Sequence, residues 1–354
     1  MKIVKGVLKA LLIIFLILVV IVAAVLVWLT AVEYKPEDHE TVTVESLGGE
    51  AGQIAPGDSV KILSWNLGFG ALGDNADFFM DGGKMVYPAD EARVRTNIDA
   101  FVNEVRIRDA DIVLFQEIDT DSDRSYHIDQ TAVFDAVGYN SRAFAYNFKV
   151  AYAPVPIPPM GKIDSGIATY SVYPISSTDR IQLPCPFSWP IRTFNLKRCL
   201  LVTRIPVEGG KDIVLINLHL EAYDDGEGKA AQTQMLMDIL NEESGKGNYV
   251  IVGGDFNQSF SNVPCNYTVY PEQWQPGSID VSSYENDWQF IMDNKIPTCR
   301  SLYYPLKGNE DSVQYYMVDG FILSKNITVE SYEIIDLGFE NSDHNPQLIN
   351  ITLN

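Results

Sequence analysis

Apolar segments that end abruptly in a polar side chain recur along this sequence, and this pattern constrains the fold more than any other feature. Segments 60–66, 111–117, 212–220 and 249–252 are short and rich in aliphatic residues, as buried strands are. The polar residues at such ends, or just before the last predicted strand, are Asn66, Glu117, His219, Asp255, Asn257, Asp343 and His344. Residues this far apart meet only if the strands share one edge of a sheet, which is where α/β proteins bind ligands. We therefore predict an α/β fold with one polar site at the strand ends.

The stretch Gly253-Gly254-Asp255-Phe256-Asn257 is the strongest of these signals. Two glycines allow a tight turn after the strand, and Asp255 and Asn257 fall on the same side if the chain is extended. Their oxygens suit a hard cation or a water beside a phosphate. An ordinary turn is the alternative, because Gly, Asp and Asn are common turn residues. Agreement with the other strand ends favours the functional interpretation.

The rest of the body alternates between predicted strands and helices. Further strands are predicted at 165–173, 199–206, 317–324, 328–336 and 347–353. Helices are predicted after Asp90, which suits an N-cap, over 128–137 and 229–240, and in a short stretch with Tyr284, Trp288 and Ile291 on one side. Four prolines in 151–161 exclude a helix or a central strand and indicate a rigid extended loop.

The N-terminus carries a long apolar run. Residues 10–32 contain no charge, and about 20 apolar residues span the hydrocarbon of a membrane. Three lysines precede the run and acidic residues follow it, which predicts a cytoplasmic segment 1–9 and a body outside the cell membrane. A cleaved signal peptide is the alternative, but the run is long for one, so a single-pass anchor is favoured.

Between the anchor and the body, residues 33–59 are polar and lack periodicity. They predict a stalk or linker, with some strand character around 41–44 that would suit an edge strand. The remaining residues, 60–354, are predicted to form one catalytic domain, and we expect a monomer.

The charge of the chain argues against binding nucleic acid through a broad basic face. The formal net charge is −21 over 354 residues, and such a surface repels phosphate polymers. A metal-bridged nucleic acid stays open as an alternative.

The four cysteines allow three pairings. Cys185 and Cys199 flank one loop and form the most plausible disulfide, with Cys265 and Cys299 left over. Buried free thiols are the alternative, because a domain of this size does not need disulfides for stability.

Seven short motifs together resemble the endonuclease/exonuclease/phosphatase superfamily. They occur in the family's order over roughly 60–354, and they are Ser64-Trp65-Asn66, Phe115-Gln116-Glu117, Ser165-Gly166-Ile167-Ala168, Asn217-Leu218-His219-Leu220, Gly254-Asp255-Phe256-Asn257, Val318-Asp319-Gly320-Phe321 and Ser342-Asp343-His344. The resemblance implies a membrane-anchored, bacterial-type member with a four-layer α/β sandwich, two facing sheets flanked by helices. It also implies Mg²⁺-dependent hydrolysis of a phosphate ester, with Mn²⁺ as a substitute.

The resemblance assigns the metal to oxygen ligands. Glu117 resembles the main metal-binding carboxylate, Asn66 lies beside it, and Asp343 resembles a further member of the metal and water cluster. Few protein oxygens and no dedicated cage are what Mg²⁺ prefers. The sequence has no His-x-x-x-His or Cys-x-x-Cys pair, so a zinc site is not expected.

The catalytic roles implied by the resemblance fall on five residues. Asp255 resembles the group that orients or deprotonates the attacking water, and Asn257 steadies the phosphate or the nucleophile. His219 and His344 resemble the groups that contact phosphate oxygens, and Asp319 resembles the carboxylate that orients His344. Cationic donors around the non-bridging oxygens suit phosphoryl transfer.

Three further residues are weaker candidates for contact with the substrate. Lys229 and Gln232 fall where the family often has an Arg and a Gln, and Lys offers a point charge where Arg offers a fork. Lys149 is the third candidate. A phospholipid or small phosphate ester is the favoured substrate class. An extracellular nuclease and a non-catalytic binding domain on the same fold are the alternatives.

Overall fold

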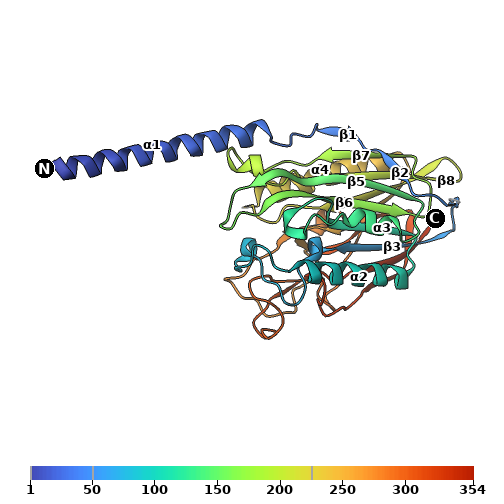
Figure 1. The fold of residues 1–354 in the computed structure, drawn as a ribbon. Helices are drawn as coiled ribbons and strands as arrows, with labels where there is room; N and C mark the ends of the chain where they lie inside the picture. The colour runs from blue at the N-terminus through green and yellow to red at the C-terminus, as the bar shows by residue number, and fades with distance from the viewer. Residues whose placement is uncertain (1, 50–51, 225) are drawn as a thin grey trace.

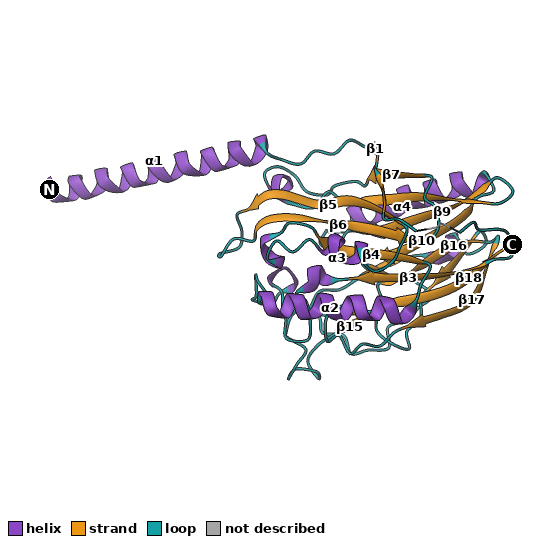
Figure 2. Cartoon of the chain, turned by 45° about the vertical axis from the view of Figure 1, so that its right-hand side comes forward, coloured by secondary structure: helices purple, strands orange, loops and turns teal. Residues whose placement is uncertain are grey.

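The computed structural model describes residues 2–49, 52–224 and 226–354 and has two facing seven-stranded sheets with helices on their outer faces (Figures 1 and 2). The helices are α1 (Lys2–Ala31), α2 (Glu91–Arg108), α3 (Gln130–Asp135) and α4 (Glu227–Gly245), with 3-10 turns η1 (Gly68–Gly70), η2 (Phe79–Asp81), η3 (Asp123–Ser125), η4 (Ile191–Phe194) and η5 (Val281–Ser283). The predicted four-layer α/β sandwich is confirmed.

Each sheet mixes parallel and antiparallel neighbours. Sheet A has the order β1 (His39–Thr41), β7 (Ser177–Gln182), β8 (Cys199–Val207), β9 (Lys211–His219), β10 (Tyr249–Asp255), β16 (Asp319–Ser324) and β13 (Trp288–Ile291). Sheet B has the order β17 (Ile327–Ile334), β18 (Gln347–Leu353), β3 (Ser59–Asn66), β4 (Ile112–Asp119), β6 (Gly161–Ser171), β5 (Ser141–Ala153) and β2 (Val44–Ser46). Two short pairs complete the strands: β11 (Gln258–Phe260) with β12 (Gly277–Ile279), and β14 (Cys299–Arg300) with β15 (Tyr315–Tyr316).

Alternation along the strands builds the layers. In β3, Val60 and Ile62 join the apolar cluster between the sheets, while Leu63 and Trp65 face outward. Trp65 packs edge-on against Phe101 of α2, with ring centroids 4.8 Å apart. Complete burial of such side chains stabilises the fold by about 1.5–3 kcal/mol each.

The opposite outer face is covered by α4. Leu236, Met237 and Leu240 of this helix are buried against Val214 and Ile216 of β9. On the other side the predicted cap of α2 is confirmed, because the Asp90 carboxylate accepts a hydrogen bond from the Arg93 amide at 2.8 Å.

Two elements differ from the sequence-based expectation. The short helix predicted around Tyr284 to Ile291 is wrong, since Trp288–Ile291 is strand β13, paired antiparallel with β16. Trp288 is buried there, so tertiary packing at the edge of sheet A outweighs the local helical spacing. Strand β5 was not predicted over most of its length, because partners from β6 and β2 define it.

The segment between the anchor and the body is held against the sheets. Strands β1 and β2 pair with β7 and β5, which confirms the strand character expected around 41–44. Ile54 is buried as well. All four cysteines are free thiols, so the expected Cys185–Cys199 disulfide is absent.

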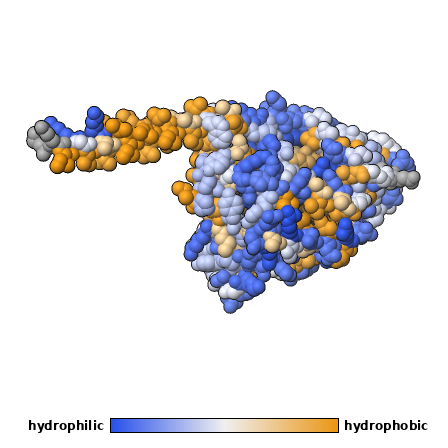
Figure 3. All heavy atoms as spheres, in the orientation of Figure 1, coloured by the Kyte–Doolittle hydropathy of each residue, from blue (hydrophilic) through white to orange (hydrophobic). Residues whose placement is uncertain are grey.

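Helix α1 projects from one end of the body (Figure 1), and its surface is apolar along most of its length (Figure 3). Residues Ile3–Ala31 are long and apolar enough to cross a membrane, and the most apolar stretch is not buried inside the protein.

Candidate active site

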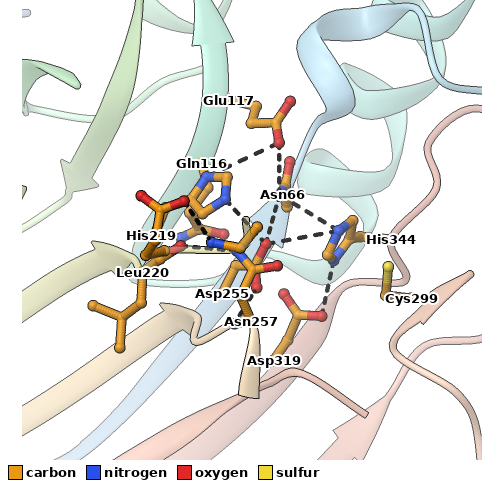
Figure 4. A network of polar contacts seen from close by, with 12 residues as sticks. Asn66, Gln116, Glu117, His219, Leu220, Asp255, Asn257, Cys299, Asp319 and His344 are labelled. Atoms are coloured by element: carbon orange, nitrogen blue, oxygen red, sulfur yellow. Dashed lines mark hydrogen bonds and ion pairs between the residues drawn. The ribbon is translucent and has the colours of Figure 1, made fainter. Parts of the chain in front are cut away.

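Three neighbouring strands of sheet A bring His219, Asp255 and Asp319 side by side. β9 and β10 run parallel with His219 opposite Asp255, and β10 and β16 run antiparallel with Asp255 opposite Asp319. Across the sandwich, β3 ends at Asn66 and β4 carries Glu117. Figure 4 shows these side chains pointing toward one another. The predicted convergence of these residues is therefore observed, but the strand ends come from two facing sheets and not from one edge of a single sheet.

An irregularity in sheet B directs Glu117 toward this cavity. The register between β4 and β6 shifts between Phe115 and Ile118, as in a β-bulge, and Glu117 has a φ of 50°. Bulges beside sites re-aim side chains, and a left-handed backbone on a non-glycine residue costs about 1–3 kcal/mol. The surrounding sheet therefore holds Glu117 in a conformation that it would not adopt alone.

Close packing between strands explains the paired glycines, since β10 runs through Gly253 and Gly254 to Asp255 and the tight turn predicted at the glycines is wrong. Gly254 has a φ of 143°, and a Cβ there would lie 2.1 Å from the carbonyl oxygen of Leu218, so no other residue fits. Asp255 Oδ1 accepts the Asn257 amide at 2.8 Å, and Asn257 Nδ2 donates to Leu220 O at 2.9 Å. Backbone contacts thus fix both polar side chains.

Asp255 lies at the centre of the site and is buried. Its Oδ2 accepts a hydrogen bond from Asn66 Nδ2 at 3.0 Å and lies 3.4 Å from His219 Nε2 and 3.7 Å from His344 Nε2. Burial, followed by the negative charge of Asp319, raises the pKa of Asp255 to about 7, although His344 opposes the shift. A carboxylate with this pKa exchanges protons near neutral pH.

The two histidines carry different charges. Burial disfavours the charged form of His344, but Asp319 Oδ2, 2.9 Å from Nδ1, raises the pKa of His344 well above its ordinary value. The predicted contact between Asp319 and His344 is observed. Burial, and then the positive charge of Arg198, lower the pKa of His219 well below its ordinary value, so His219 is neutral.

A hydrogen-bonded bridge between the sheets supports these strand ends. Gln116 Nε2 donates to Asn217 Oδ1 at 2.8 Å, and Asn217 Nδ2 donates to Phe115 O and Ala168 O at 3.1 and 2.9 Å. Gln116 precedes Glu117, and Asn217 lies two residues before His219. The bridge therefore fixes the distance between the two halves of the site.

The donor set fits a hard divalent cation. Glu117 and Asp343 line the cavity, and so does Asp81, a residue that the sequence did not single out. Burial, and also the charge of Glu117, raise the pKa of Asp343 to about 6, while enclosure and the charge of Asp343 raise the pKa of Asp81 to about 7. Carboxylates that repel one another in this way gain stability from a cation between them.

Two groups beside Glu117, the His219 ring and the Asn66 amide, bear on how a ligand would bind. The His219 Nδ1 atom is buried without a hydrogen-bond partner in the described part of the chain, 4.0 Å from Glu117 Oε1. Such an orphaned polar atom indicates room for a ligand atom. Asn66 presents its amide nitrogen to Glu117 at 3.4 Å, while its oxygen accepts from the Gly68 amide. Ligation through the Asn66 oxygen therefore requires the amide to turn over, and it stays a prediction.

Among the described residues, two compact groups have the donor types of a metal site, and both include His344. One adds Asp255 and Asp319, and the other adds Cys299 and Asp343. The ring of His344 is already engaged by Asp319. Burial raises the pKa of the Cys299 thiol to about 12, so it stays protonated. Glu117 and Asp343 are the better candidates for a hard cation.

Three arginines line the cavity that the sequence alone did not reveal. Arg124 forms two hydrogen bonds with the Asp119 carboxylate, Arg198 pairs with Glu221, and Arg300 donates to backbone carbonyls that include Gly73 O. None of them belongs to one of the motifs, so no local spacing indicates it.

The three weaker substrate candidates lie away from the cavity lining. Lys149 Nζ lies 3.3 Å from Asp164 and above the ring of Tyr146. Gln232 accepts a hydrogen bond from the Glu221 amide. Lys229 lies 5.8 Å from the ring of Trp274, which lines the cavity. Of the three, Lys229 lies nearest a lining residue through its side chain, and Lys149 directly follows the lining residue Phe148.

Comparison with known proteins agrees with this geometry. The sequence profile of the Endonuclease/Exonuclease/phosphatase family matches residues 63–344, so the chain belongs to this family. Members of the family are mostly metal-dependent hydrolases of phosphoesters, and they include phosphodiesterases, nucleases and phosphatases. No curated protein sequence matches the chain.

Solved structures share the fold at low sequence identity. An endonuclease/exonuclease/phosphatase from Beutenbergia cavernae DSM 12333 is 18% identical, with a TM-score of 0.57 over 84% of this chain and 72% of that one. The human Nocturnin catalytic domain with bound sulfate is 16% identical, with a TM-score of 0.52 over 88% and 97%. D. rerio TDP2 complexed with a single-strand DNA product is 15% identical, with a TM-score of 0.51 over 83% and 99%.

Proposed function

We propose that this protein is a divalent-cation-dependent hydrolase of phosphate esters that acts on a phospholipid or a small phosphoester. The observation that carries the proposal is the position of Asp255, which lies between a neutral and a protonated histidine in a cavity with Glu117. A base, a cationic donor and a metal-binding carboxylate are the groups that such a hydrolysis needs.

The chain's own residues divide the work as follows. Asp255, whose pKa is about 7, accepts a proton from water held near it, and Asn66 Nδ2 fixes the carboxylate that receives it. The His344 imidazolium, held by Asp319, donates to phosphate oxygens. Neutral His219 supplies a further polar contact through its free Nδ1.

Glu117 and Asp343 would hold the cation, with Asn66 beside them. A bound Mg²⁺ or Mn²⁺ supplies positive charge that balances the negative charge on the phosphate oxygens. Asn257 completes the site by fixing the turn that aims Asp255.

The distribution of charge favours lipids and small esters over nucleic acids. Each of Arg124, Arg198 and Arg300 is already hydrogen-bonded within the protein, and the chain has a formal net charge of −21. Binding of duplex DNA relies on basic residues that displace counterions. A nuclease is the second candidate, since D. rerio TDP2 has been solved with a single-strand DNA product.

We also infer a place for the protein in the cell. Helix α1 would span the cytoplasmic membrane with residues 1–9 inside, because its lysines precede the apolar run. The body would then act outside the cytoplasm as a monomer. Protease added to intact cells tests the orientation: digestion of the body supports it, and protection contradicts it.

A substrate panel tests the activity. Full-length protein in detergent is incubated with Mg²⁺ or Mn²⁺ and with phosphatidylcholine vesicles, sphingomyelin vesicles, inositol phosphates, plasmid DNA and single-stranded DNA. Asp255→Ala should abolish turnover, and Asp99→Ala, an exposed change on α2, should not. Nicking of DNA with lipids and small esters untouched would replace the favoured substrate class by nucleic acid.

A further inference from the structure

Two loops expose large apolar side chains at the end of the body from which α1 emerges. The loop between β5 and β6 carries Val155 and Ile157, which are 52% and 94% exposed, and the loop between β7 and β8 carries Trp189 and Ile191, at 53% and 46%. We call these four side chains the loop surface. Single exposed apolar residues are ordinary, but four of them in two loops at one end mark an interaction site.

The last turn of α1 is fixed to the loop between β7 and β8 and to the end of β5. Trp189 Nε1 donates to Thr30 Oγ1 at 3.1 Å, and the rings of Trp28 and Tyr152 meet edge-on with centroids 6.4 Å apart. Leu29 is only 2% exposed, because the body covers it. The C-terminal end of the membrane-length helix and the loop surface would therefore lie at the same depth relative to a membrane that α1 crosses.

Ion pairs hold the chain directly after the helix. Glu33, whose side chain is 1% exposed, accepts a hydrogen bond from Arg192 Nε at 2.9 Å and lies 3.5 Å from Lys197 Nζ. Among the described residues there is thus no free spacer between α1 and the body, and the body lies close to any membrane that α1 crosses.

The cavity lies at this end as well. Figure 1 shows α1 leaving where β5 and β6 turn, while the C-terminus lies at the opposite end. Phe148 of β5 and Leu196, which follows η4, both line the cavity. Tyr87 Oη donates to Pro159 O at 3.0 Å and ties the loop before α2 to the loop between β5 and β6. The strand and the segment that carry the loop surface therefore also supply residues to the wall of the cavity.

We propose that the loop surface docks into the bilayer that α1 crosses and turns the cavity toward the lipid headgroups of that leaflet. Trp and aliphatic side chains favour this interface, and Figure 3 shows apolar colour at the edge of the body below α1. Because the chain is acidic, apolar contact and not electrostatic attraction drives the docking. The substrate is then a glycerophospholipid phosphoester presented at the surface. This choice of substrate rests on the proposed function, whereas the docking does not.

Docking is measured first, without any need for activity. Ile157→Cys is made in a Cys185→Ser, Cys265→Ser background, labelled with a polarity-sensitive fluorophore, and placed as full-length protein in vesicles of phosphatidylcholine and phosphatidylglycerol. The label should shift to the blue and be quenched by brominated acyl chains. Ile107→Cys is the matched control, 61% exposed near the end of α2 that points away from α1, and should show neither effect. Equal behaviour at both positions would overturn the docking.

Turnover is measured second, on two substrates. Ile157→Asp should lower hydrolysis of phosphatidylcholine in the same vesicles on the order of tenfold, because a charge in the interface depopulates the docked orientation. Its rate on soluble bis(4-nitrophenyl) phosphate should stay within about twofold of the native rate, and Ile107→Asp should match the native protein on both. An unchanged rate on vesicles refutes the inference. If the native protein hydrolyses neither substrate while the Ile157 label is quenched, the proposed function fails and the docking stands.

Discussion

Replacing Asn217 should destabilise the protein by an amount that follows from its hydrogen bonds. The side chain is fully buried on β9, donates to Phe115 O and Ala168 O, and accepts from Gln116 Nε2. Asn217→Leu keeps the volume and removes all three bonds. Each contributes about 1 kcal/mol net. The buried Gln116 amide keeps only its long contacts to Leu114 O and Ser64 Oγ, at 3.4 and 3.5 Å, and this weaker pairing costs about 1–2 kcal/mol more. The added apolar burial offsets about 1–2 kcal/mol, so we expect a net loss of about 3 kcal/mol.

The assay is thermal unfolding of the full-length protein in detergent, followed by tryptophan fluorescence. A loss of this size should lower the midpoint by about 5 °C for a body of this length. Thr203→Val is the matched control on the neighbouring strand β8. Its buried hydroxyl has no hydrogen-bond partner among the described residues, so its removal should be neutral or stabilising. The reasoning is refuted if Asn217→Leu unfolds at the native midpoint, or if Thr203→Val lowers the midpoint as much.

Three further outcomes are expected. Glu117→Ala should cut the metal-dependent rate by a factor on the order of 10² or more. The unfolding midpoint of this variant should stay within about 2 °C of the native value, because a strand-end carboxylate adds little to the core. Excess chelator should lower the activity of the native protein in the same way, and full activity in chelator would contradict the metal site. The pKa of His344 is raised, and its charged form binds phosphate, so native activity should fall as the pH rises through that pKa. Asp319→Asn should move this fall in activity to lower pH. Identical pH profiles of the native protein and the variant would disprove the pairing of Asp319 with His344. Burial raises the pKa of Glu243, but hydrogen bonds, led by the one from Arg204, lower it overall from 4.5 to about 2. The ionised Glu243 therefore stabilises the protein above pH 4.5, and this stabilisation is lost as the pH falls toward 2. In Glu243→Gln the free energy of unfolding should depend less on pH between 4.5 and 2, and an unchanged dependence would count against this contact.

The strands that end at the site and the identity of their end residues were readable from the sequence. An apolar run such as 249–252 determines a strand, because the pattern of side chains is a local property. The position of Asp255 at the end of this strand was predicted correctly, although the strand continues through Gly253 and Gly254 and does not turn there. The cap at Asp90 and the apolar stripe of α2 were predictable for the same reason.

Elements that depend on partners were decided only by the tertiary structure. Trp288–Ile291 has the spacing of a helix, but the open edge of β16 makes it a strand. Residues 39–41 of the predicted stalk form β1 against β7, so the segment between anchor and body is held in place. Pairing across a sheet joins residues distant in sequence, and no local periodicity reports it.

The chemistry of the site also depended on the tertiary structure. Two histidines that look alike in sequence differ in charge, because Asp319 lies against His344 while burial and Arg198 keep His219 neutral. Nothing in the sequence indicates that Asp81 lines the cavity, because a long loop brings it close to Asp343 only in the folded chain. The sequence determined which groups are available at the strand ends. Their charges depend on burial and on neighbours within a few ångströms, and only the folded chain fixes those.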